Sequence, residues 1–175
     1  MLDDDIVEAA KKLLAICKHK NLLVATAESC TAGLVAGTLT EIPCVSSILD
    51  RGYITYSDEA KHQMLGVPQE TLEKHGAVSS QTAEAMVRGV LGHSRVHLVV
   101  SVTGIAGPDG GSAKKPVGLV FFGAGTHGGK LLAVEKRYGN IGRDKVRKES
   151  VLQAFRMLHE LAEGEAGNPP RQAVS

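Results

Sequence analysis

The chain has 175 residues, of which 43% are hydrophobic and 22% charged, as in an ordinary soluble globular domain. Its 20 basic and 19 acidic residues give a formal net charge of +1, so we expect no nucleic-acid partner. Because it has no apolar run of roughly 20 residues and no signal-peptide pattern, we expect a cytoplasmic protein without membrane association.

The first half of the chain alternates helical patterns with short apolar runs. Residues 3–20 place apolar side chains on one helical face, with acids at the start and lysines at the end. A buried strand is predicted at 22–27, followed by a helix of small residues at 30–40. A second strand at 48–56 precedes a helix that Ser57 is expected to cap.

The second half repeats this alternation and adds a hairpin. Ser79 or Ser80 is predicted to cap a helix there. Residues 1–164 are thus expected to form one domain, and 165–175 a disordered tail. The predicted elements of this half are a short helix at 66–76, a longer helix at 79–92, a strand at 96–104, a hairpin of 117–125 with 130–138, and a final amphipathic helix at 141–164.

This order of elements predicts an α/β fold, namely a three-layer α/β/α sandwich with a mixed sheet. In such folds ligands bind beyond the carboxyl ends of the strands. Two stretches follow predicted strands directly, "AESCTAG" at 27–33 and "TGIAGPDGG" at 103–111. If their strands are parallel, both loops open toward the same edge of the sheet.

Ser29 stands between the first predicted strand and the helix that follows. A hydroxyl there can act as a nucleophile, with the amides of Cys30, Thr31 and Ala32 at the helix start as oxyanion donors. The same serine can instead be a simple helix N-cap. The G-x-S-x-G pattern of hydrolases is absent, so this stretch leaves both interpretations open.

A nucleophilic serine needs a base, and Lys61 is the candidate. It follows Tyr53 and Tyr56 in "YITYSDEAK". A partly buried lysine can lose its proton near neutral pH, and a tyrosine hydroxyl can relay protons. The alternative is a solvated lysine on a helix surface.

Two further stretches are candidate anion sites. Arg143 and Arg147 lie one turn apart at the start of the last predicted helix and could grip a phosphate, or simply form a solvated basic face. Glycines that let main-chain amides approach an anion occur in the second loop, which is otherwise a tight surface turn. These glycines are Gly104, Gly107, Gly110 and Gly111.

Metal and redox chemistry are not expected. Cys17, Cys30 and Cys44 lack CxxC spacing, and the seven histidines are scattered. We therefore predict no metal, no cofactor and no disulfide.

Five motifs occur in an order that is specific to one family. They are "TAESCTAG", "RGYITYSDEAK", "GAVSSQTAEAMVRG", "VTGIAGPDGGSAKKPVGLVFF" and "GRDKVRKESVLQAFRML". Over residues 5–162 the chain resembles the C-terminal domain of the competence/damage-inducible protein CinA, which also occurs alone as a bacterial nicotinamide mononucleotide deamidase. The resemblance implies metal-free hydrolysis of the carboxamide of this nucleotide to nicotinate mononucleotide and ammonia. It also implies a five-stranded mixed sheet and a homo-oligomer.

The resemblance also implies a set of site residues. The resulting hypothesis has Ser29 as nucleophile and Lys61 as base. Cys30 and Ser46 are competing nucleophiles, Cys30 because the helix N-terminus expected there would lower the pKa of its thiol. The loop 104–111 and Arg143 are expected to hold the ribose phosphate. The polar residues that match the family's motifs are Ser29, Ser46, Tyr56, Lys61, Thr103 and Arg143.

Within this hypothesis the remaining polar groups assist the chemistry. Proton transfer to Lys61 is direct or passes through Tyr56 or Ser46. Thr103 is expected to help to hold the oxyanion, together with main-chain amides that include those of Cys30 and Thr31.

Two positions depart from the family's pattern, and one rival function remains. Ala32 and Cys44 stand where the family commonly has glycine, which makes both loops stiffer or slightly displaced. The nucleotide-hydrolysing domain that precedes this one in full-length CinA is absent from the sequence, so its activity is not expected. The rival function is a non-catalytic module that senses a nucleotide or docks to competence or DNA-damage partners.

Overall fold

The computed structural model describes residues 3–169, which form a five-stranded sheet flanked by helices. No helix within this range combines the length and apolar character needed to cross a bilayer. In chain order the elements are α1 (Asp4–Lys20), β1 (Val24–Glu28), α2 (Leu34–Thr40), the 3-10 helix η1 (Val45–Ser47), β2 (Leu49–Ile54), α3 (Asp58–Leu65), α4 (Gln69–His75), α5 (Ser80–His93), β3 (Leu98–Gly104), β4 (Leu119–Thr126), β5 (Leu131–Arg137) and α6 (Arg143–Gly164).

The sheet is mixed, with strand order β2-β1-β3-β4-β5. Strands β2, β1 and β3 run parallel, whereas β4 and β5 are antiparallel to their neighbours and form the predicted hairpin. The predicted fold class is confirmed. Because β1 and β3 are parallel neighbours, the two loops singled out from the sequence leave the sheet on the same side, at the carboxyl ends of these strands. We call this side the carboxyl edge of the sheet, and the side at the amino ends of β1, β2 and β3 the amino edge.

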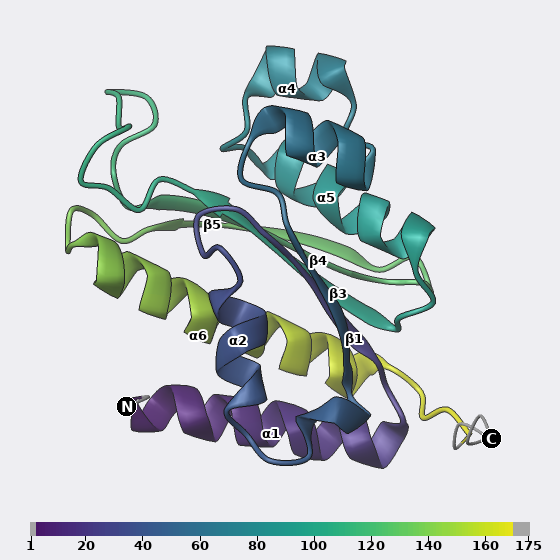
Figure 1. Ribbon diagram of the computed structural model, residues 1–175. Helices are drawn as coiled ribbons and strands as arrows, with labels where there is room; N and C mark the ends of the chain where they lie inside the picture. The colour runs from purple at the N-terminus through teal and green to yellow at the C-terminus, as the bar shows by residue number, and fades with distance from the viewer. Residues whose placement is uncertain (1–2, 170–175) are drawn as a thin grey trace.

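Helices cover both faces of the sheet (Figure 1). Helices α1, α2 and α6 lie on one face, and α3, α4 and α5 on the other. Side chains of β1 alternate between the two cores: Val24 belongs to the larger core, and Ala25 and Ala27 to the smaller one. By the same alternation, Glu28 and Ser29 emerge at the carboxyl end of β1 on opposite faces.

Helix α2 begins later than predicted. Residues 29–33 form a turn, and the helix starts at Leu34 rather than at Cys30. Ala32 and Gly33 both have positive φ, 48° and 92°, which a right-handed helix does not allow. The prediction of a helix over 30–40 was therefore wrong in its first turn.

The predicted serine caps are present. Ser57 Oγ accepts a hydrogen bond from the Ala60 amide at the start of α3. Ser79 Oγ accepts one from the Thr82 amide, so Ser79 rather than Ser80 caps α5. These caps fix where both helices begin.

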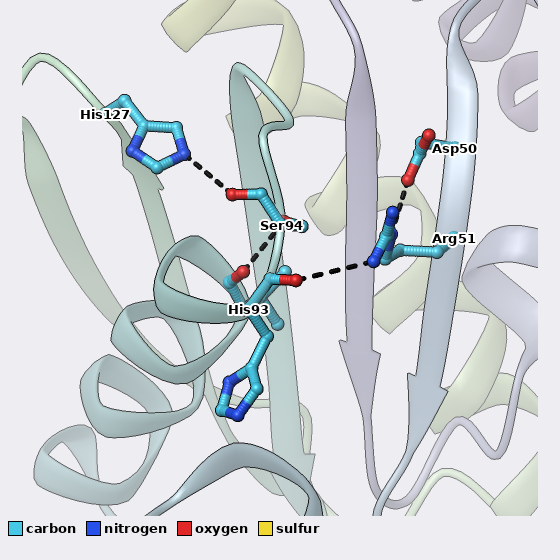
Figure 2. A network of polar contacts seen from close by, with 6 residues as sticks. Asp50, Arg51, His93, Ser94 and His127 are labelled. Carbon is cyan, nitrogen blue, oxygen red and sulfur yellow. Dashed lines mark hydrogen bonds and ion pairs between the residues drawn. The ribbon is translucent and has the colours of Figure 1, made fainter.

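The carboxyl end of α5 lies at the opposite edge of the sheet, and Figure 2 shows the polar contacts around it. Ser94 Oγ donates to the Val90 carbonyl at 2.7 Å, and Arg51 Nη1 donates to the His93 carbonyl at 3.5 Å. The His127 ring lies 3.1 Å from the Ser94 carbonyl. Arg51 also pairs with Asp50. The contacts to Val90 and His93 satisfy carbonyls that a helix end leaves without partners.

Part of the predicted tail is described. Residues 166–169 belong to no helix or strand, but the Asn168 amide donates to the Lys20 carbonyl, and the Asn168 carbonyl accepts from the Asn21 side chain, both at 2.8 Å. The last six residues of the predicted tail, 170–175, lie outside the described residues.

Candidate active site

A cavity of about 250 Å³ opens at the carboxyl edge of the sheet, and we call it the Ser29 pocket. The ends of β1 and β3 form its floor, and the start of α6 forms one wall. A larger hollow of about 430 Å³ between α1 and α6 is remote from Ser29. The Ser29 pocket is lined by Ser29, Cys30, Tyr56, Ala77, Val78, Thr103, Gly104, Ile105, Ala106, Gly107, Asp109, Gly110 and Arg143.

The central contact joins Ser29 to Lys61. Lys61 Nζ lies 3.0 Å from Ser29 Oγ and donates to the Thr55 carbonyl at 2.7 Å and to the Tyr56 carbonyl at 3.4 Å. Lys61 is fully buried and Ser29 is 8% exposed. The cap at Ser57 sets the start of α3 and hence the position of Lys61 one turn later. Lys61 is therefore no solvated surface lysine.

Burial changes the acid–base character of Lys61. Removal of the ammonium group from water lowers the pKa of Lys61 from its usual 10.5, although the nearby Asp58 carboxylate acts in the opposite direction. A larger fraction of the amine is thus unprotonated at a given pH than in a solvated lysine. The neutral amine is the form that can accept a proton from Ser29.

The N-cap residue of α2 is Gly33, and the side chain that accepts from the amides at the start of this helix is that of Glu28, not Ser29. The Glu28 carboxylate accepts hydrogen bonds from the amides of Gly33, Val35 and Ala36 at 2.9–3.0 Å. The interpretation of Ser29 as an N-cap was therefore wrong. The amides at the start of α2 are not available as oxyanion donors, because this carboxylate already accepts from them. The predicted donors, the amides of Cys30, Thr31 and Ala32, lie in the turn that precedes the helix.

Cys30 lacks the activation that the sequence suggested. Burial raises the pKa of the Cys30 thiol to about 11, and the Glu28 carboxylate adds to this rise. A helix N-terminus lowers a thiol pKa, but α2 begins four residues further on and its end is occupied by Glu28. The expected low-pKa thiol is thus not present, which disfavours Cys30 as the nucleophile.

Two predicted threonines do not offer a free hydroxyl to the Ser29 pocket. Thr103 lines the pocket, but its hydroxyl donates to the Ala77 carbonyl at 2.8 Å. Its proton therefore points at the main chain in this structure, rather than at a reacting oxygen. Thr31 is fully buried and does not line the Ser29 pocket, so a direct substrate contact for its side chain is not supported.

Arg143 and Tyr56 meet at the pocket mouth. Arg143 Nη1 donates to the Gly107 carbonyl at 2.8 Å, and Nη2 lies 3.4 Å from the Tyr56 hydroxyl. Tyr56 is 60% exposed, and its hydroxyl contacts Arg143 rather than Lys61. Arg147 instead donates to the Thr31 carbonyl and lines a different cavity. Arg143 and Arg147 therefore do not converge on one anion site, which was one of the two alternatives for this pair.

The glycine-rich loop contributes most of its predicted residues to the pocket. Gly104, Gly107 and Gly110 line it, whereas Gly111 does not. Gly107 has φ +84°, and a Cβ added there would come within 2.6 Å of Val117. A side chain at this position is thus opposed by both backbone strain and contact.

Ser46 lies away from the pocket. It is an exposed residue of η1, which precedes the amino end of β2, whereas Ser29 follows the carboxyl end of the parallel strand β1. The length of a strand therefore separates Ser46 from Ser29, about 15–20 Å at 3.3 Å per residue. Within one chain, the prediction that Ser46 shares the site or relays protons was wrong.

Sequence reasoning missed several residues of the site. Glu28 carried a signal, because an acid that ends a buried apolar strand needs buried partners. Asp109 was part of a quoted motif but was given no role, although it lines the pocket. The carbonyls of Thr55 and Ala77 left no trace in the sequence, since any residue supplies one.

The fold and the site together define an α/β/α sandwich protein with a pocket at the carboxyl edge of the sheet, where a pocket-lining serine contacts a fully buried lysine. The family model for the CinA C-terminal domain matches residues 6–162. The chain therefore belongs to the CinA C-terminal domain family.

Individual relatives span different shares of their own length. A protein of Caldicellulosiruptor bescii, named as a competence-damage inducible protein, is 53% identical over 114 residues, which are 65% of this chain and only 28% of that relative. A nicotinamide-nucleotide amidohydrolase PncC of Enterobacter agglomerans is 43% identical over 152 residues, covering 87% of this chain and 92% of that one. The crystal structure of competence/damage inducible protein CihA from Agrobacterium tumefaciens matches with a TM-score of 0.90 and 50% identity, covering 92% and 98% of the two chains.

Proposed function

We propose that this protein is a nicotinamide-nucleotide amidohydrolase, which converts nicotinamide mononucleotide to nicotinate mononucleotide and ammonia. The observation that carries the proposal is the 3.0 Å contact between Ser29 Oγ and the buried amine of Lys61. The relatives named for this activity support it, since one of them aligns over 92% of its own length. Amide hydrolysis of this kind requires a nucleophile with a base in hydrogen-bond reach. Ser29 lines the pocket, and Lys61 reaches it from a buried position behind the pocket wall.

The surroundings of Lys61 suit a general base. When the amine is neutral, its two N–H groups donate to the carbonyls of Thr55 and Tyr56, and its lone pair faces the Ser29 hydroxyl. Ser29 Oγ then attacks the amide carbon while its proton passes to Lys61. As the C–N bond breaks, Lys61 returns this proton to the leaving ammonia. Water later hydrolyses the acyl-serine ester and yields the carboxylate.

The proposed oxyanion donors are the amides nearest Ser29. Of the three amides expected from the sequence, that of Ala32 donates to the Ser29 carbonyl. This leaves the amides of Cys30 and Thr31 for the developing charge. The Thr103 hydroxyl joins them only if it leaves the Ala77 carbonyl.

Arg143 is the proposed phosphate anchor. Its guanidinium lies at the mouth of the Ser29 pocket, where the phosphate of a nucleotide would reach solvent. To bind phosphate it exchanges the neutral acceptors Gly107 and Tyr56 for a charged one. This exchange favours substrates that carry the phosphate over free nicotinamide.

The test is product analysis with a matched serine control. Purified protein is incubated with nicotinamide mononucleotide without added metal, and ammonia and nicotinate mononucleotide are quantified. Ser29→Ala should lose about three orders of magnitude or more in kcat. Ser101→Ala is the control, because Ser101 is also buried and hydrogen-bonded, to Ala83 and Gly123, but does not line the pocket.

Three outcomes would count against the proposal. Full activity in Ser29→Ala would remove Ser29 as nucleophile, and loss of activity in Cys30→Ala alone would transfer that role. Calorimetric binding of the nucleotide without turnover by the wild type would instead indicate the nucleotide-sensing module.

A further inference from the structure

We propose that Glu28 is a positioning residue for Ser29: its buried carboxylate fixes the turn 29–33 and thereby holds Ser29 Oγ at Lys61 Nζ. The proposal rests on the proposed function, in which Ser29 is the nucleophile and Lys61 the base. Glu28 does not touch the reacting atoms in this arrangement. Its contribution is to the geometry of those that do.

Both oxygens of the Glu28 carboxylate accept hydrogen bonds. It is 1% exposed and accepts hydrogen bonds from the amides of Gly33, Val35 and Ala36. The Thr26 hydroxyl donates to its Oε1 at 3.0 Å. A buried carboxylate with four donors is strongly held, because each bond to a charged acceptor is stronger than a neutral one.

These bonds join both ends of the turn. Glu28 is the last residue of β1, and its amide partners are the last turn residue and the first turn of α2. The Ser29 amide donates to the Val102 carbonyl of β3, which fixes the other side of the serine. The segment from Ser29 to Gly33 is thus held at both ends, and Ser29 has little freedom to move.

The turn needs such an anchor because its backbone is unfavourable. Ala32 has φ 48°, a left-handed conformation that costs a residue with a Cβ roughly 1–2 kcal/mol. Without the carboxylate, the amides at the start of α2 would lack their acceptor and the turn could relax. Glu28 and Ser29 leave β1 on opposite faces, so the anchor works from behind the pocket without entering it.

The test compares Glu28→Gln with Thr26→Val. In Glu28→Gln one carboxylate oxygen becomes an NH₂ group, so at least one α2 amide faces a donor instead of an acceptor. Thr26→Val removes the hydroxyl bond but keeps the carboxylate on all three amides. We expect kcat for nicotinamide mononucleotide to fall about 10–100-fold in Glu28→Gln with KM within about twofold, because small misplacement of a nucleophile is costly. Thr26→Val should keep kcat within about twofold.

The pH profile separates positioning from electrostatics. Burial lowers the pKa of Lys61, and Asp58 and Cys30 act in the opposite direction. The Glu28 carboxylate lies on the face of β1 that α2 covers, away from α3, which carries Lys61. The midpoint of the kcat profile should therefore stay at the wild-type pH in Glu28→Gln, with the whole curve lowered by one factor. A shifted midpoint would overturn the positioning role in favour of an electrostatic one.

Crystal structures provide a readout that does not depend on turnover. In Glu28→Gln the Ser29 Oγ–Lys61 Nζ distance should lengthen from 3.0 Å to beyond about 3.5 Å, past hydrogen-bond range. An unchanged distance, or wild-type kcat in this variant, would overturn the proposal. If the wild type does not turn over the nucleotide, the proposed function fails while this distance still tests Glu28. Should Glu28→Gln not fold, Glu28→Asp takes its place, with the same expected split between kcat and KM.

Discussion

The polar side chains at the amino edge of the sheet and those at the carboxyl edge make different kinds of contact. At the amino edge, Ser94 and Arg51 donate to carbonyls at the end of α5, and each is a neutral or exposed group with ordinary partners (Figure 2). At the carboxyl edge, the fully buried amine of Lys61 contacts the hydroxyl of Ser29, which lines a pocket. The first arrangement finishes a helix, whereas the second keeps an ionisable group out of water. Burial of an ionisable amine costs free energy, and such groups cluster at functional sites, which is why the proposed function assigns Lys61 a chemical role.

The largest effect is expected from removal of the amine of Lys61, and the same substitution at a second lysine is its control. Lys61→Met should lower kcat by about 10²–10⁴-fold, because it removes the proposed general base. Lys20→Met is the matched control: Lys20 Nζ donates to the carbonyls of Ala162 and Glu165, far from the Ser29 pocket. Steady-state kinetics of both variants should show full activity for Lys20→Met. Equal losses in the two variants would mean that the assay reports stability alone.

Arg143→Ala should weaken substrate binding more than it slows the chemistry. We expect KM to rise about 10–100-fold with kcat within about fivefold, since the guanidinium contacts the phosphate and not the carboxamide. Initial rates over a range of nucleotide concentrations separate the two parameters. The variant should also lose the preference for the nucleotide over free nicotinamide. A fall in kcat at unchanged KM would contradict the anchor role.

The lowered pKa of Lys61 gives two pH dependences. The proposed base is active when neutral, so kcat should rise with pH through the pKa of Lys61 in the folded protein. Between this pKa and 10.5 the unfolded chain binds more protons at Lys61 than the folded chain does. The free energy of unfolding should therefore rise with pH in that window, and this stabilisation is lost as the pH falls through the folded pKa.

Chemical denaturation across this pH range, with Lys61→Met beside the wild type, checks the second dependence. The difference in unfolding free energy should move in favour of the wild type as the pH rises. A constant difference would mean that burial leaves the pKa of Lys61 unchanged.

At the amino edge, Ser94→Ala should affect stability alone. Loss of the bond to the Val90 carbonyl should lower the free energy of unfolding by about 1 kcal/mol, measured by denaturant titration. The kcat for the nucleotide should stay at the wild-type value. A clear loss of kcat in Ser94→Ala at full folding would break the division of roles between the two edges.

The smallest expected effect is a gain in stability on substitution of Ala32. Ala32 has φ 48°, so Ala32→Gly should relieve backbone strain and raise the free energy of unfolding by about 0.5–1 kcal/mol after the entropy of glycine is deducted. Thermal or denaturant unfolding measures it. A loss of stability would indicate that the Ala32 methyl group packs better than its φ suggests.

Much of the architecture could be predicted from the sequence because it depends on local pattern. The alternation of apolar residues gave the order of strands and helices, and the serines at 57 and 79 marked helix starts through their own side chains. The hairpin followed from glycines between two apolar runs. The start of α2 was missed because Ala32 adopts a left-handed conformation that alanine rarely takes, and nothing local announces it.

The composition of the site was only partly predictable. The sequence by itself determined which reactive groups are available, and its motifs indicated Ser29, Lys61 and Arg143 as candidate site residues. Tertiary structure alone decided their partners, because hydrogen bonds between residues 32 positions apart depend on strand order and on which face each side chain takes. Strand order also explains why Ser46 lies at the amino edge of the sheet, away from Ser29. The face that each side chain takes explains why the carboxylate of Glu28, rather than the hydroxyl of Ser29, contacts the start of α2. Side-chain chemistry is local, whereas the distance between two side chains is a property of the whole fold.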